Sequence, residues 1–285
     1  CGYKSELMRT AIGDGSDLGL DIEYSYEDEP LGTGGAMKLV EDRLDDTFVA
    51  ANGDVFVSMD VSGEIDIHRS TGAAVTIALT PVDNPCEFGI ARVDDELRIT
   101  EFKEKPKPEE VFSNLINAGV YVLQKDVLSE VPEGTFYDFS KDLVPRLMSE
   151  GRRIQGYEVD GIWMDVGRPR DLLRANLAIA DAEYAGRDWK APGCALDGSF
   201  YLGPGSSVNG CRLTDTAILN HSSVKASDLD RVLVMEGCEI HGARIANSIL
   251  GEGCRVGKGA VVTDSVLADG TVVKPGEVLD QGRTV

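Results

Sequence analysis

The C-terminal third of the chain repeats with a period of 16 residues. Within each repeat, three aliphatic positions are spaced six, five and five residues apart. The three series are Leu202, Ile218, Val234, Leu250 and Val266; Val208, Val224, Ile240, Val256 and Val272; and Leu213, Leu229, Ile245 and Val261. Three such positions predict a coil with three corners, whose side chains point inward and stack about 4.8 Å from their equivalents in the next coil. Because this arrangement buries its core only by stacking, residues 202–285 are predicted to form a triangular parallel β-helix.

Small residues dominate the turn positions of this repeat. One column contains Gly205, His221, Gly237, Gly253 and Asp269, and the next contains Ser206, Ser222, Cys238, Cys254 and Gly270. Packing at a corner explains them, and it places Cys238 and Cys254 as stacked neighbours. A metal shared by these two thiols is the alternative, but no other soft ligand lines up with them.

Strands and helices alternate over residues 1–185, which indicates an α/β sheet with helices on its faces. Strands are expected at 21–26, 48–51, 73–80, 89–93, 97–103, 117–122 and 154–159. Helices are expected at 5–12, 31–40, 61–69, 126–131, 140–150 and 168–185. The polar segment 186–201 is predicted to link this domain to the β-helix.

Two carboxylates lie at predicted strand ends. The apolar run Phe48–Ala51 is typical of a buried strand of a parallel sheet, and it stops at Asn52-Gly53, so that Asp54 follows directly. Asp165 interrupts a second short apolar piece. Ligands gather beyond the carboxyl ends of such strands, and a carboxylate there suits Mg²⁺ bound together with substrate phosphates. The alternative for Asp54 is a turn residue that caps the next helix.

Two further segments are candidates for ligand contacts. The glycine-rich turn 31–36 precedes a helix, so its backbone N–H groups could approach a ligand closely. In the charged segment 101–108, prolines stiffen the chain and hold Glu104 and Lys105 in fixed directions. Asn117 is a polar residue in an otherwise apolar strand. Each signal alone is weak, because flexible turns and solvated loops have the same composition.

Composition excludes several classes. The formal charge of −21 argues against non-specific binding to nucleic acid. No run of 18 apolar residues predicts a membrane span. Six cysteines without a CxxC pair indicate reduced thiols rather than a disulfide framework, and together with the lack of a signal peptide they favour the cytoplasm.

The order of the motifs resembles the sugar-1-phosphate nucleotidyltransferase family over residues 2–185. The matching segments are Leu31-Gly32-Thr33, Asn52-Gly53-Asp54, Glu104-Lys105-Pro106, Asn117-Ala118-Gly119 and Trp163-Met164-Asp165-Val166-Gly167. The details are most similar to mannose-1-phosphate guanylyltransferases, with glucose-1-phosphate thymidylyl- and uridylyltransferases close behind. The resemblance implies a Rossmann-like mixed sheet, and an NTP, with GTP favoured, and a sugar 1-phosphate as substrates.

The resemblance also implies a role for each matching residue. Asp54 and Asp165 would hold Mg²⁺ between them, and Gly32 and Thr33 would lie along the nucleotide. Glu104 and Asn117, with the backbones of Gly89 and Gly119, would face the sugar hydroxyls. Lys105 would neutralise the sugar phosphate. Such a transfer needs charge neutralisation and alignment more than covalent help from the protein.

The chain departs from the family pattern at its start. Members of the family begin with a loop of the form GxGTRLxPxT that cradles the triphosphate, and no such loop occurs here. The sequence therefore resembles an N-terminally truncated member that lacks its first βαβ unit. We expect the 285-residue chain alone to bind NTP poorly and to form no sugar nucleotide.

The 16-residue repeat is similar to the left-handed β-helix of hexapeptide-repeat proteins, which also follows the catalytic domain in this nucleotidyltransferase family. Hexapeptide acyltransferases use a His at the coil edge, but solvated side chains are the favoured interpretation of His221 and His241. The resemblance implies an oligomer of identical chains. Besides an enzyme, a non-catalytic regulatory or assembly subunit with the same fold stays open, as does a bifunctional enzyme whose β-helix also acylates.

Overall fold

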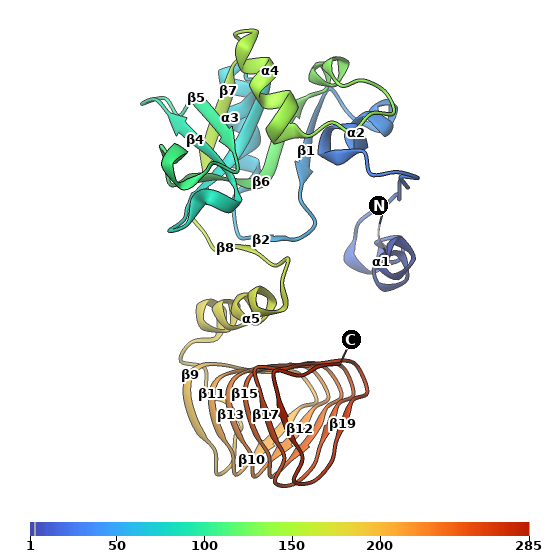
Figure 1. Cartoon of the computed structure of the whole chain (residues 1–285), viewed down its shortest axis with the longest axis vertical. Coiled ribbons are helices and arrows are strands. Elements are labelled where there is room, and N and C mark those ends of the chain that lie inside the picture. The colour runs from blue at the N-terminus through green and yellow to red at the C-terminus, as the bar shows by residue number, and fades with distance from the viewer. Residues whose placement is uncertain (3, 285) are drawn as a thin grey trace. The chain divides into compact units, whose positions relative to one another are not determined.

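The first half of the protein is built on one mixed sheet with the ten-residue strand β6, Leu115–Gln124, at its centre (Figure 1). The computed structural model of the chain describes residues 1–2 and 4–284. They divide into two compact units, residues 1–163 and 164–285. The sheet of the first unit has the strand order β5-β4-β6-β3-β7, and β1 also pairs with β6. This mixed α/β sheet confirms the predicted fold class.

The elements of the first unit follow the chain. Its α-helices are α1 (Ser5–Ile12), α2 (Gly32–Leu39), α3 (Val61–Thr71) and α4 (Val144–Ser149). Its strands are β1 (Thr47–Ala51), β2 (Val55–Val57), β3 (Val75–Pro81), β4 (Gly89–Val93), β5 (Ile99–Glu104), β6, β7 (Ile154–Glu158) and β8 (Trp163–Asp165), the last of which ends beyond residue 163. Short helical turns are η1 (Ser16–Leu18), η2 (Glu41–Arg43), η3 (Pro85–Glu87), η4 (Pro108–Glu110), η5 (Lys125–Glu130) and the π-helical turn η6 (Phe139–Leu143).

Two sequence-based expectations about strands are wrong. Strand β1 pairs antiparallel with β6, with Ala51 opposite Val120, and is not a buried parallel strand. Only Phe48 of its apolar run is buried, and Val49 is exposed. No strand forms at residues 21–26. A short apolar or alternating run carries no information about the direction or existence of its partner, and tertiary pairing decides both.

Helices cover both faces of the sheet. One face packs Ile77, Leu79 and Tyr121 against Leu143 and Leu147 of η6 and α4. On the other face, α3 contributes His68, which is fully buried. The His68 ring bonds Thr76 of β3 through Nδ1 (2.9 Å) and Gln124 of β6 through Nε2 (3.0 Å). Burial and the neighbouring Arg69 lower the pKa of His68, so the ring is a neutral bridge between the helix and the sheet.

Glu64 lies one helical turn before His68 and is also fully buried. Neither of its carboxylate oxygens has a hydrogen-bond partner. Burial raises the pKa of Glu64 from 4.5 to about 7, because an apolar environment disfavours the charged form. Helix α3 therefore carries a carboxyl group whose ionisation opposes folding.

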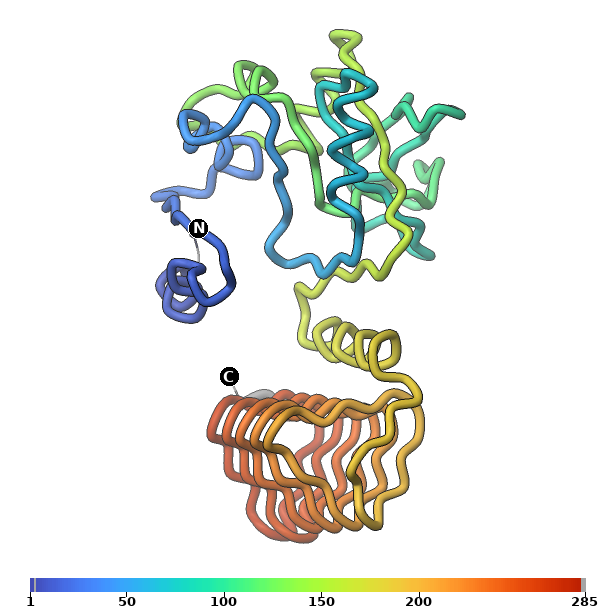
Figure 2. Tube along the Cα trace, turned by 180° about the vertical axis from the view of Figure 1, so that it is seen from behind, coloured from blue at the N-terminus to red at the C-terminus, as the bar shows by residue number. Residues whose placement is uncertain are grey.

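The second unit begins with α5 (Pro169–Tyr184) and continues as a parallel β-solenoid, in which each coil pairs with the next (Figure 2). One face is the five-stranded ladder β10 (Ser207–Asn209), β12 (Ser223–Lys225), β14 (Glu239–His241), β16 (Arg255–Val256) and β19 (Val272–Val273). The other strands are β9 (Ala195–Leu202), β11 (Arg212–Ile218), β13 (Asp228–Val234), β15 (Arg244–Leu250), β17 (Val261–Thr263), β18 (Val266–Leu267), β20 (Val278–Asp280) and β21 (Arg283–Thr284).

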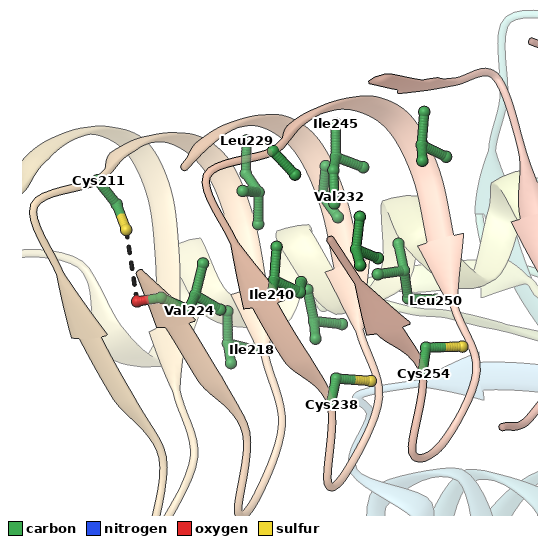
Figure 3. Close-up of a cluster of buried hydrophobic side chains, with 14 of the residues drawn as sticks. Cys211, Ile218, Val224, Leu229, Val232, Cys238, Ile240, Ile245, Leu250 and Cys254 are labelled. Atoms are coloured by element: carbon green, nitrogen blue, oxygen red, sulfur yellow. Dashed lines mark hydrogen bonds between the residues drawn. The ribbon is translucent and has the colours of Figure 1, made fainter. Parts of the chain in front are cut away.

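The predicted period of 16 holds through the first coils. Leu213 pairs with Leu229, which pairs in turn with Ile245. Val224 pairs with Ile240, and the side chains of Val224, Leu229, Ile240 and Ile245 are buried in the core (Figure 3). Cys238 and Cys254 lie at the same position of neighbouring coils, as predicted, and both are buried free thiols. Their sulfurs donate to the carbonyls of Gly251 (3.1 Å) and Ala268 (3.3 Å).

The last coils are one residue longer than predicted. Val256 lies 16 residues after its partner Ile240, whereas Val261 lies 17 after its partner Arg244. The extra residue falls in the turn after Val256. The inward residues there are consequently Val262, Leu267 and Val273, so the assignment of Val261, Val266 and Val272 to the core is wrong. The first turn column likewise ends at Gly270 (φ 69°) rather than at Asp269.

His221 and His241 are exposed, in agreement with the interpretation of solvated side chains. Among the described residues, no helix combines the length and the apolar character needed to cross a lipid bilayer.

A charge on the inward face of the solenoid should open it. Val224 is fully buried and the adjacent Lys225 is exposed. Val224→Asp places an unpaired carboxylate in a dry core, at a cost of several kcal/mol, whereas Lys225→Asp leaves its charge in water. We expect thermal unfolding and limited proteolysis to show a large loss for the first variant and almost none for the second. Equal melting temperatures would contradict the assigned inward face.

Glu64 should make stability depend on pH. A raised pKa in the folded state contributes stability that is fully present below pH 4.5 and is lost as the pH rises through 7. We expect Glu64→Gln to remove a decline of about 3 kcal/mol between pH 4.5 and pH 8, measured by denaturant unfolding. The exposed Glu133→Gln is the matched control. If the free energy of unfolding changed with pH in the same way for Glu64→Gln and the wild type, the Glu64 carboxyl group would have a partner in the folded protein.

Candidate functional site

The candidate site is built around a break in the pairing of β6. Ile77 of β3 lies opposite Tyr121, but Leu79, two residues later, lies opposite Asn117. The intervening residues of β6 therefore form a bulge, and Gly119 within it has φ 78°. A bulge leaves backbone groups unpaired and re-aims neighbouring side chains. In the motif Asn117-Ala118-Gly119, Asn117 is the paired residue before the bulge and the other two belong to the bulge.

Three backbone groups of the bulge have partners in the predicted motifs. The Gly119 N–H donates to Asn117 Oδ1 (2.9 Å), and the Gly119 carbonyl accepts from the Asn52 N–H (2.8 Å). The Ala118 carbonyl accepts from Trp163 Nε1 (2.8 Å). The structure thus brings together Asn117, Gly119 and the turn Asn52-Gly53-Asp54.

The close contact between the bulge of β6 and the Asn52 turn requires a glycine at position 119. A Cβ at this position would lie 2.8 Å from Asn52 Nδ2, and the positive φ is a conformation that other residues rarely adopt. Asp54 is exposed and follows the turn that Gly119 holds. The end of β1 is therefore fixed by β6, and the Asp54 carboxylate is presented to solvent from a fixed turn.

The glycine-rich turn at the start of α2 packs on the segment 135–139. The N–H groups of Gly34 and Gly35 donate to the Tyr137 carbonyl, at 2.8 and 3.1 Å. A Cβ at Gly35 would lie 2.7 Å from the carbonyl oxygen of Thr135. These two N–H groups are consequently occupied within the protein. The two glycines allow the backbone of α2 to lie close to the backbone of the segment 135–139. The expectation that they face a ligand is wrong for Gly34 and Gly35.

Asp138 joins this turn to β6, and sequence reasoning missed it. Its Oδ1 accepts from the N–H groups of Ser140 (2.8 Å) and Lys141 (3.0 Å) and so caps η6. Its Oδ2 accepts from Thr33 Oγ1 (3.4 Å). The Ser140 hydroxyl in turn accepts from Asn117 Nδ2 (3.0 Å). The signal available in the sequence was an Asp ahead of a helical segment, which by itself predicts only a cap.

Glu104 and Lys105 end strand β5 beside Gly89. A Cβ at Gly89 would lie 2.6 Å from Glu104 Oε2, so the missing side chain leaves the space that this carboxylate fills. Lys105 has φ 46°, an uncommon conformation for a non-glycine residue, and its N–H donates to the Phe88 carbonyl (2.9 Å). Strain of this kind persists only where the surroundings fix it, and it occurs frequently at functional sites.

Burial and the charged groups around Glu104 act on the pKa of its carboxyl group in opposite directions. Burial raises the pKa of Glu104, and the nearby Asp138 raises it further, while Lys105 and Lys141 oppose both effects. Glu104 is therefore a half-buried carboxyl group on which one other carboxylate and two ammonium groups act. Such a mixture can accept hydrogen bonds from hydroxyl groups and can neutralise a phosphate.

Asp165 belongs to the second unit, and its Oδ1 accepts from the Gly167 N–H (3.0 Å). Its predicted pairing with Asp54 stays a prediction. Within the part of the chain that the structure describes, no group of three or more His, Cys, Asp or Glu side chains is arranged to hold a metal. Asp54 and Asp165 each carry a carboxylate of the kind that a divalent metal ion binds in proteins, its other ligands coming from phosphates and water.

Comparison with known proteins identifies the class. The nucleotidyl transferase family matches residues 2–182, and a GlmU-like C-terminal hexapeptide domain matches residues 216–282. The chain therefore belongs to the nucleotidyl transferase family and carries a hexapeptide-repeat domain. The resemblance to sugar-1-phosphate nucleotidyltransferases that the five motifs indicated is confirmed.

Individual relatives agree with this assignment. The chain is 34% identical over 281 residues to a mannose-1-phosphate guanylyltransferase of Mycobacterium tuberculosis, covering 98% of this chain and 68% of that protein. It is 28% identical over 288 residues to a UTP–glucose-1-phosphate uridylyltransferase of Synechocystis, covering 96% and 71%. The crystal structure of HddC from Yersinia pseudotuberculosis shares the fold, with a TM-score of 0.52 and 24% identity over 61% of this chain and 74% of that one.

Gly119 offers a direct test of the bulge. Gly119→Ala adds both strain at positive φ and a clash with Asn52, whereas Gly134→Ala adds strain alone, since nothing lies within 4 Å of a Cβ there. We expect Gly134→Ala to cost about 1 kcal/mol and Gly119→Ala about 2 kcal/mol more in denaturant unfolding. The amide signal of Asn52 should shift in Gly119→Ala and not in Gly134→Ala. Equal costs would mean that the turn before Asp54 does not depend on Gly119.

Proposed function

We propose that the protein transfers a nucleotidyl group from GTP to mannose 1-phosphate and releases pyrophosphate. The observation that carries this proposal is the bulge of β6, whose groups bond the Asn52 turn on one side and Asn117 on the other. The similarity to a mannose-1-phosphate guanylyltransferase of Mycobacterium tuberculosis supports GTP and mannose 1-phosphate as the substrates. The Synechocystis relative makes UTP and glucose 1-phosphate the second candidate pair.

Each residue has a proposed role. Gly32 and Thr33 lie along the nucleotide, while Glu104 and the backbones of Gly89 and Gly119 receive the sugar hydroxyls. The Asn117 amide already bonds Tyr121, Ser140 and the Gly119 N–H. Its contribution to sugar binding is therefore made mainly through the shape of the bulge.

Lys105 is proposed to place the nucleophile. An oxygen of the sugar phosphate attacks the α-phosphorus in line, and pyrophosphate leaves. No general base is required, because the attacking phosphate is already ionised near pH 7. The Lys105 ammonium reduces the repulsion between the two anionic reactants and aligns them. Mg²⁺ held by Asp54 and Asp165 would offset charge on the phosphate oxygens.

The setting of this reaction is also a proposal. We infer a cytoplasmic enzyme, since all six cysteines are free thiols. We also infer an oligomer of identical chains.

The assignment is tested by pyrophosphate release with GTP, UTP, dTTP and ATP, each with mannose 1-phosphate and glucose 1-phosphate. The assay is run on the 285-residue chain and on the same chain preceded by a segment with the family's GxGTRLxPxT loop. We expect GTP with mannose 1-phosphate to give the highest kcat/KM in the loop-bearing form. Lys105→Met should lower it by about 100-fold, the scale of losing one charge-stabilising group.

Lys107→Met, two residues along the same exposed loop, is the matched control and should leave turnover unchanged. Higher kcat/KM with UTP and glucose 1-phosphate would favour the second pair. No turnover and no nucleotide binding in either form would overturn the enzymatic assignment and favour a non-catalytic subunit.

A further inference from the structure

A continuous set of hydrogen bonds connects motifs that lie far apart in the sequence. Thr33 Oγ1 accepts from the Phe139 N–H (2.8 Å) and donates to Asp138 Oδ2 (3.4 Å). Asp138 Oδ1 accepts from the Ser140 N–H, and the Ser140 hydroxyl accepts from Asn117. Asn117 then holds Gly119, whose carbonyl holds Asn52. The path therefore runs from the glycine-rich turn to the turn before Asp54, and Asp138 is its central member.

Asp138 is held firmly in this position. Its own N–H donates to Asp142 Oδ2 (2.8 Å), while its carboxylate accepts three hydrogen bonds from different donors. It starts a π-helical turn, a rare element that occurs frequently at functional sites. A side chain that serves only as a cap would not need its second oxygen directed to another helix.

The same carboxylate lies in the electrostatic environment of Glu104. The charged groups that act on Glu104 are Asp138 and Lys141 from the η6 segment and Lys105 from its own loop. Burial raises the pKa of the Tyr121 phenol of β6, and the charges of Asp138 and Glu104 raise it further. Asp138 thus interacts with the nucleotide side through Thr33 and with the sugar side through Asn117 and Glu104.

We propose that Asp138 is a positioning residue that couples the two halves of the site. Through Thr33 it fixes the glycine-rich turn, through Ser140 it fixes Asn117, and its negative charge sets the charge environment of Glu104. This inference rests on the proposed function in taking Glu104 as a ligand of the sugar. A displacement on the nucleotide side, at Thr33, should therefore be detected on the sugar side, at Asn117 and Glu104, and the reverse should also hold.

The test measures the free protein, so it does not require substrate. Glutamate side chains are labelled with ¹³C, Glu104 is assigned with Glu104→Gln, and its titration is followed by NMR. Asp138→Asn keeps an acceptor oxygen for the η6 cap but removes the charge, and we expect a lower titration midpoint for Glu104. Asp142→Asn keeps an acceptor oxygen for the Asp138 N–H and removes a charge that is not among those acting on Glu104, so it is the matched control, with no shift expected.

Hydrogen exchange tests whether Thr33 fixes the glycine-rich turn. Thr33→Val removes the bonds to Phe139 and Asp138, and we expect the Gly34 and Gly35 amides to exchange about tenfold faster, as for the loss of one or two hydrogen bonds. Thr33→Ser should restore wild-type exchange. Asp138→Ala should produce both effects, and its melting temperature shows whether it folds.

An unchanged Glu104 midpoint in Asp138→Asn, or unchanged exchange in Thr33→Val, would overturn the positioning role. Failure of the proposed function has a different result. In that case no NTP and sugar phosphate pair supports turnover, while the midpoint and exchange changes still occur.

Discussion

The first unit depends on the backbone pairing of β6, and above all on the point where that pairing is interrupted. A buried strand cannot leave N–H and C=O groups without partners, because each would cost about as much as a lost hydrogen bond. Here Trp163, Asn117 and Asn52 replace the missing strand contacts. The residues that satisfy the bulge are members of the motifs assigned to substrate binding, so the same contacts support both the fold and the site.

The mixed sheet and the motifs of the site could be predicted from sequence, because glycines, prolines and isolated polar residues mark them locally. The link between Thr33 and Asp138 could not, since it joins residues 105 apart and obeys no periodicity. The direction of β1 was equally inaccessible. An apolar run of four residues does not report the direction of its strand, and the antiparallel choice is made by β6, which follows much later in the chain.

The solenoid shows where a periodic signal becomes ambiguous. In the first coils the repeat marks the inward position clearly at six aliphatic residues that each follow a polar residue: Val208, Leu213, Val224, Leu229, Ile240 and Ile245. In the last coils the inward residues Val262, Leu267 and Val273 each follow another valine. Either member of each pair satisfies the pattern, and only the pairing of neighbouring strands selects the second. Val272 is 61% exposed as a result.

The longer turn after Val256 has a consequence for how this domain tolerates change. Each coil bonds only to the coils beside it, so an added residue alters one corner and leaves the strands on either side in register with their own partners. Residues inserted there would lengthen a surface loop without disturbing the core. The turn from Gly257 to Gly259 is therefore a position at which the chain can acquire a new loop, or accept an engineered one, while the solenoid stays intact.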